Sequence, residues 1–74
     1  MTPHLVRVRI PGLGPSAEGA IVLYVAMFDT KEEALRAVKL AVPNEWRVED
    51  VVGQADESIV RRRKLAAGAV DMLA

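Results

Sequence analysis

Apolar and polar residues alternate from residue 5 to residue 10. Val6 and Val8 fall on one side of an extended chain, and Arg7 and Arg9 fall on the other. A period of two with β-branched residues is typical of a half-buried strand. The glycines and prolines of residues 11–19 then predict a flexible hairpin loop, which is long enough to contact a partner. They do not predict a phosphate loop, because a strand follows instead of a helix N-terminus.

The run Ala20–Phe28 is apolar throughout and rich in β-branched and aromatic residues. Bounded by breakers, it predicts a second strand, antiparallel to the first. Both of its faces are apolar, and one helix covers only one face of a sheet. Two interpretations follow: a second helix buries the other face, or that face stays partly open and meets a second copy or another protein.

A helix over residues 31–42 has the clearest signals in the chain. Thr30 and Glu33 have the spacing of a capping box, and Pro43 disfavours helical geometry at the residue before it. Ala34 and Val38 begin an apolar stripe at helical spacing. The entry into this helix resembles the strand-to-helix junction of many small bacterial proteins, a resemblance that reflects capping rules and implies no function.

Residues 45–52 alternate again and predict a third strand, with a bulge or strand end at residues 51–53. The C-terminal segment allows two interpretations. A continuous helix from Glu57 to Leu73 places arginines on its apolar face. We favour a helix broken near residues 65–68, because Gly68 disfavours a helix interior. The first part then ends near Lys64, and a short helical turn spans residues 69–73.

The predicted fold is therefore α+β, in the order β-β-α-β-α, with a three-stranded sheet packed against helices in one domain of residues 1–74. A chain of 74 residues without cysteine has a marginal core and no disulfide to support it. Two means of stabilisation remain: association with a second copy or another protein, and an efficient apolar core. The composition, 51% hydrophobic, indicates a core that suffices for folding. The aromatic residues Tyr24, Phe28 and Trp46 are the candidate interface residues, although for Trp46 we favour a core position over an interface role.

The charge balance argues against nucleic acid as the partner. Ten basic and ten acidic residues give a formal net charge of zero, whereas nucleic-acid-binding domains carry a positive excess. The alternative is a nucleic-acid-associated protein that uses six basic residues: Arg7, Arg9, Arg61, Arg62, Arg63 and Lys64. Consecutive cations spread around a helix, and their position at a helix C-terminus compensates the dipole, so we favour the structural explanation.

Enzymatic, metal and membrane functions find little support in the sequence. The chain has one imidazole, His4, in a segment expected to fray, and it has no thiol, so we expect no metal site and no cofactor. We expect no enzyme, because no nucleophile is placed beside a base. The longest apolar run, nine residues, is too short to span a membrane as a helix, and a cytoplasmic location is expected.

Overall fold

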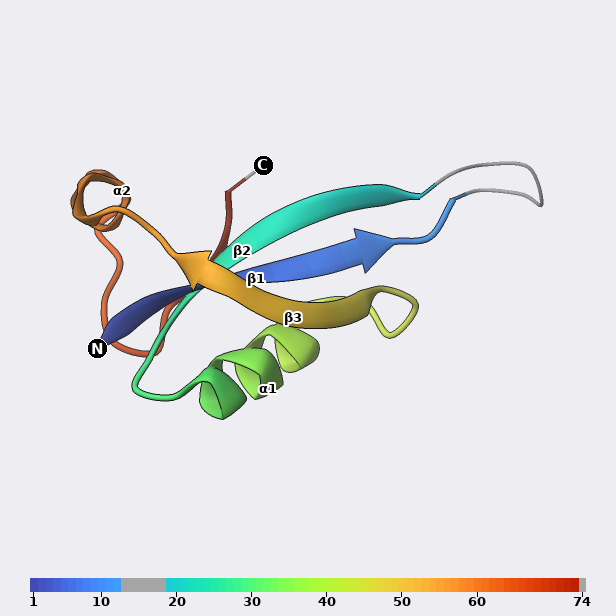
Figure 1. Cartoon of the computed structure of the whole chain (residues 1–74), viewed down its shortest axis with the longest axis horizontal. Coiled ribbons are helices and arrows are strands. Elements are labelled where there is room, and N and C mark those ends of the chain that lie inside the picture. Colours follow the sequence, from blue (N-terminus) through green and yellow to red (C-terminus); the bar gives the residue numbers. More distant parts are fainter. Residues whose placement is uncertain (13–18, 74) are drawn as a thin grey trace.

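The computed structural model describes residues 1–12 and 19–73, so most of the predicted hairpin loop lies outside the described residues (Figure 1). One sheet has the strand order β3-β1-β2-β4, and every neighbouring pair is antiparallel. The predicted α+β class is confirmed. The elements are β1 (Thr2–Ile10), β2 (Ala20–Phe28), α1 (Lys31–Ala41), β3 (Arg47–Gln54), α2 (Glu57–Arg62) and β4 (Val70–Met72).

The prediction of three strands was wrong, because the expected helical turn at residues 69–73 contains β4. The Gly68 N–H donates to the Met27 carbonyl at 2.8 Å, and the Met27 N–H donates to the Ala69 carbonyl at 2.9 Å. The outer side of β2 has unpaired backbone groups, and this segment satisfies some of them. A three-residue strand has too little periodicity to be distinguished from a helical turn in the sequence.

The helix α1 forms as its local signals predict. The Thr30 hydroxyl accepts from the Glu33 N–H at 3.2 Å and donates to the Glu33 carboxylate at 3.1 Å. Ala34, Val38 and the following Val42 are buried against the sheet. The helix stops just before Pro43, and the Val42 N–H closes it by donating to the Val38 carbonyl.

The core between α1 and the sheet consists of small side chains. Among the described residues, the largest fully buried side chains are valines: Val6, Val8 and Val38 in this core, and Val25 on the opposite face of the sheet. His4 is not frayed as expected: it is 5% exposed and paired with Ala26 in the β1–β2 ladder. Its strand is held on both sides, by β2 and by β3, which keeps the start of the chain ordered.

The helix α2 ends at Arg62, slightly before the predicted end near Lys64, in a Schellman motif. The Leu65 N–H donates to the Val60 carbonyl at 3.0 Å, and the Lys64 N–H donates to the Arg61 carbonyl at 3.2 Å. Lys64 itself takes the left-handed conformation, with φ of 54°. The continuous helix is therefore excluded, and the break precedes residues 65–68.

The two helices cover the sheet unequally. In Figure 1, α1 lies along one side of the sheet, and the β1–β2 hairpin extends well beyond it. On the opposite face, α2 lies at one end, where Val60 lines a shallow pocket with Pro3 and Met27. Val25 and Met27 are buried there, but Ile21, on the same face of β2, is 49% exposed. The second face of β2 is thus only partly covered.

Candidate functional site: the open edge of the sheet

The three candidate interface aromatics are not brought together into one cluster. Tyr24 and Phe28 lie on the α1-facing side of β2, whereas Trp46 precedes β3 on the other side of β1. Each is partly buried and packs against the core. They anchor the edges of the core, and no single surface consists of all three.

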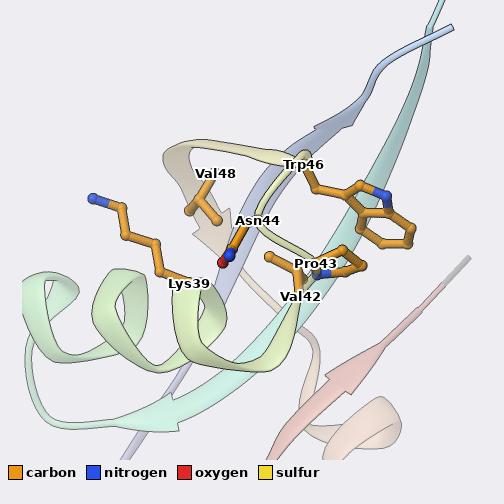
Figure 2. A pocket seen from close by; sticks show the side chains of 6 residues that line it. All are labelled: Lys39, Val42, Pro43, Asn44, Trp46 and Val48. Carbon is orange, nitrogen blue, oxygen red and sulfur yellow. The ribbon is translucent and has the colours of Figure 1, made fainter.

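The hollow beside Trp46 does not form a developed ligand site. It has a volume of about 260 Å³ and is lined by Lys39, Val42, Pro43, Asn44, Trp46 and Val48. Figure 2 shows Lys39 and Trp46 on opposite sides of it, with the lysine amine directed away from the indole. Other surface hollows have similar volumes, near the lower limit of typical small-molecule pockets.

Arg7 and Arg9 converge on one carboxylate, Glu49 of β3. The Arg9 Nε–H donates to Glu49 Oε2 at 3.0 Å. The Arg7 Nε lies 2.9 Å from Oε1, but its alignment is not that of a hydrogen bond, so this contact is an ion pair. The hydrogen bond from Arg9 lowers the pKa of Glu49 below its ordinary 4.5; burial opposes this effect, and both guanidinium charges reinforce it.

The C-terminal basic run is also partly neutralised. Arg61 faces Glu57 at 3.8 Å, and Arg63 binds Asp71 at 2.8 Å. Within the described part of the chain, Arg62 and Lys64 are the members of the run without an ion pair. The geometry therefore does not favour phosphate binding over the structural explanation, and the nucleic-acid hypothesis stays a prediction.

The outer edge of β3 is unsuited to pairing with another strand. Its register against β1 shifts twice, and one of the two shifts confirms the bulge predicted at residues 51–53. Bulges interrupt the row of free backbone groups and increase the local twist. Arg47, Glu49 and Asp50 add charge along this edge, a common protection against edge-to-edge association.

The outer edge of β4 is occupied by the side chain of Arg63. Ala69 and Leu73 form backbone hydrogen bonds with β2. Because alternate residues of a strand bond to opposite sides, the carbonyl of Met72, between them, points away from β2. The Arg63 Nη1 donates to that carbonyl at 3.1 Å, and Nη2 lies 3.4 Å from the Leu73 carbonyl. This guanidinium occupies the position that an added strand would need.

The edge of β2 that extends beyond β4 is protected neither by a bulge, as β3 is, nor by a covering side chain, as β4 is. The Leu73 N–H donates to the Leu23 carbonyl, and the Met27 N–H donates to the Ala69 carbonyl, so odd-numbered residues of β2 bond outwards. By the same alternation, the N–H and C=O of Ile21 point outwards. Among residues 1–12 and 19–73, nothing pairs with them. We call the backbone of residues 20–22 the open edge.

Apolar side chains flank the open edge on both faces of the sheet. Ile21 is 49% exposed on one face, and Met72, paired with Tyr24, is 45% exposed on the other. A further hollow, of about 240 Å³, lies between α1 and Phe28, the end of β2 away from the open edge; its lining includes Leu40, which is 83% exposed, and also the charged Glu33 and Arg36. Sequence reasoning missed Ile21, Leu40 and Met72, although the absence of charge in β2 was a signal for the first.

Two structural features are not found among the described residues: a cluster of metal-ligating side chains and a helix that could cross a membrane. No group of three or more His, Asp or Glu side chains lies close enough there to hold a metal ion. None of the helices found there has the length and apolar character needed to cross a bilayer. Comparisons with protein-family models, curated protein sequences and solved structures find no match, so the geometry of the chain carries the functional argument.

Proposed function

We propose that this chain is a non-enzymatic protein-binding module that accepts an extended protein segment at its open edge. One observation carries the proposal: the outward N–H and C=O of Ile21 are unpaired among the described residues, whereas bulges protect β3 and Arg63 protects β4. In strand addition, main-chain hydrogen bonds supply affinity, and side chains on alternate faces supply specificity.

The flanking residues determine which segments fit. An added strand would lie beside Ile21 on one face and beside Ala20 and Val22 on the other, with Met72 at the adjoining end of β4. A strand with apolar side chains can pack against both faces, because it places no charged group there without a partner. Each new backbone hydrogen bond contributes only about 1 kcal/mol, so the two bonds at Ile21 do not by themselves give a Kd of about 0.1–1 mM, which corresponds to about 4–5.5 kcal/mol. Burial of apolar surface beside Ile21 supplies the rest.

Peptide binding mapped by NMR tests the proposal. A library of random decapeptides is selected on the immobilised chain, and synthetic versions of the selected peptides are titrated into ¹⁵N-labelled protein. We expect the amide shifts to centre on Ile21 and Leu23. Shifts centred on the Trp46 hollow or on α2 would overturn the proposal.

Two substitutions at Ile21 sharpen this test. Ile21→Pro deletes an N–H that points away from β1, so it should remove peptide binding and leave a cooperative unfolding transition. Ile21→Lys places a charge beside the edge and should weaken binding at least about tenfold. Val52→Lys is the matched control, because Val52 is 48% exposed on β3. Equal binding by the Ile21 and Val52 variants would contradict strand addition.

A further inference from the structure

We infer that the segment received at the open edge is β2 of a second copy of this chain, paired antiparallel across a two-fold axis at Ile21. The inference rests on the proposed function and names its partner. The resulting contact is isologous, so each copy contributes the same groups and the assembly stops at two chains.

The chemistry of β2 favours a second copy over a charged partner. Residues 20–28 contain no charged side chain, and the whole chain has a formal net charge of zero. When a strand pairs antiparallel with itself, identical residues meet near the axis, so any charge close to the axis would face its own kind. At the open edge this repulsion is absent. The outer edge of β3, by contrast, carries Arg47, Glu49 and Asp50.

The backbone geometry is also self-complementary. With Ile21 opposite Ile21 of the second copy, the outward N–H of each residue meets the outward C=O of the other, which closes a hydrogen-bonded antiparallel pair. The two Ile21 side chains then lie side by side on the face that α2 leaves uncovered. On the face of α1, Ala20 lies opposite the Val22 of the second copy, and both residues are apolar.

The small core gives the second copy an energetic role. Among the described residues no side chain larger than valine is fully buried, and Tyr24, Phe28 and Trp46 all keep part of their surface exposed. A standard interface buries about 800 Å² on each partner, roughly a sixth of the 5057 Å² that this chain exposes. Three paired residues cover less than that, so we expect a dimer that dissociates on dilution.

Disulfide trapping tests the inference cleanly, because the chain contains no cysteine. Facing residues in a hydrogen-bonded antiparallel pair have Cα atoms about 5.5 Å apart, within the range that a disulfide spans. We expect Ile21→Cys to form a covalent dimer under mild oxidation, which is read on a non-reducing gel. Val52→Cys, matched in exposure, should stay largely monomeric. Equal trapping of both variants, or none at Ile21, would overturn the two-fold contact.

The mass of the unmodified chain provides a second readout that does not depend on a substitution. Light scattering should show a rise from monomer towards dimer between about 10 μM and 1 mM protein, and Ile21→Lys should abolish the rise. A wild-type monomer throughout this range would exclude the second copy. If selected peptides still bound the open edge, the proposed function would stand with a different protein as partner. If they did not, both proposals would fail.

Discussion

Replacing Arg63 by alanine should release β4 from the end of α2. The Arg63 guanidinium binds the Asp71 carboxylate at 2.8 Å and the Met72 carbonyl at 3.1 Å, and it lies 3.4 Å from the Leu73 carbonyl. Both charged side chains are 39% exposed, so solvent weakens their ion pair, to about 0.5 kcal/mol. The bond to the Met72 carbonyl adds about 1 kcal/mol, and the longest contact adds little.

We therefore expect Arg63→Ala to lower the unfolding free energy by about 1.5 kcal/mol, or Tm by about 6–12 °C for a domain of this size. Thermal unfolding followed by the fluorescence of Trp46 measures the change. Arg62→Ala is the matched control, because Arg62 is a neighbouring exposed arginine with no ion pair among the described residues. Arg63→Lys should fall between the wild type and Arg63→Ala, because an ammonium lacks the planar fork.

A local measurement separates this explanation from a general loss of stability. The amides of Met27 and Leu73 bond across the β2–β4 ladder. In Arg63→Ala their hydrogen exchange should accelerate more than that of Val6 and Val8, which lie in the central strand. The reasoning would be refuted if Arg62→Ala were equally destabilising, or if exchange accelerated uniformly across the sheet.

Substitutions at three further positions test separate features of the fold. His4 is 5% exposed and its Nε2 has no partner among the described residues. His4→Leu should therefore raise the free energy of unfolding in urea by about 1 kcal/mol. A lower free energy of unfolding in this variant would mean that Nε2 is hydrogen-bonded. Because Lys64 has a φ of 54°, Lys64→Gly should leave Tm unchanged or raise it, whereas Lys64→Val should cost about 1–2 kcal/mol. Glu49 has a lowered pKa in the folded chain, so its ion pairs with Arg7 and Arg9 stabilise the fold above pH 4.5 and are lost as pH falls through the lowered value. The Tm difference between wild type and Glu49→Gln should thus be constant from neutral pH down to about pH 5 and shrink towards pH 3; a difference independent of pH would contradict the ion-pair explanation.

Features that depend on neighbouring residues could be read directly from the sequence. The Thr30 cap and Pro43 bound α1 because a cap bonds within one turn and a proline restricts the residue before it. The strands at residues 5–10 and 20–28 followed from period-two alternation and from an apolar run between breakers, although β1 begins earlier than predicted, at Thr2. The uncharged character of β2 was equally visible, and it is the property on which the proposed self-association depends.

Features that depend on residues distant in the chain were decided by the tertiary structure. Residues 70–72 form a strand because the outer side of β2 has free backbone groups beside them, and local periodicity has no access to that fact. The convergence of Arg7 and Arg9 on Glu49 requires the register of β3 against β1. The same holds for the open edge: the sequence determined that β2 is apolar and uncharged, but only the strand order and the length of β4 left Ile21 at the border of the sheet.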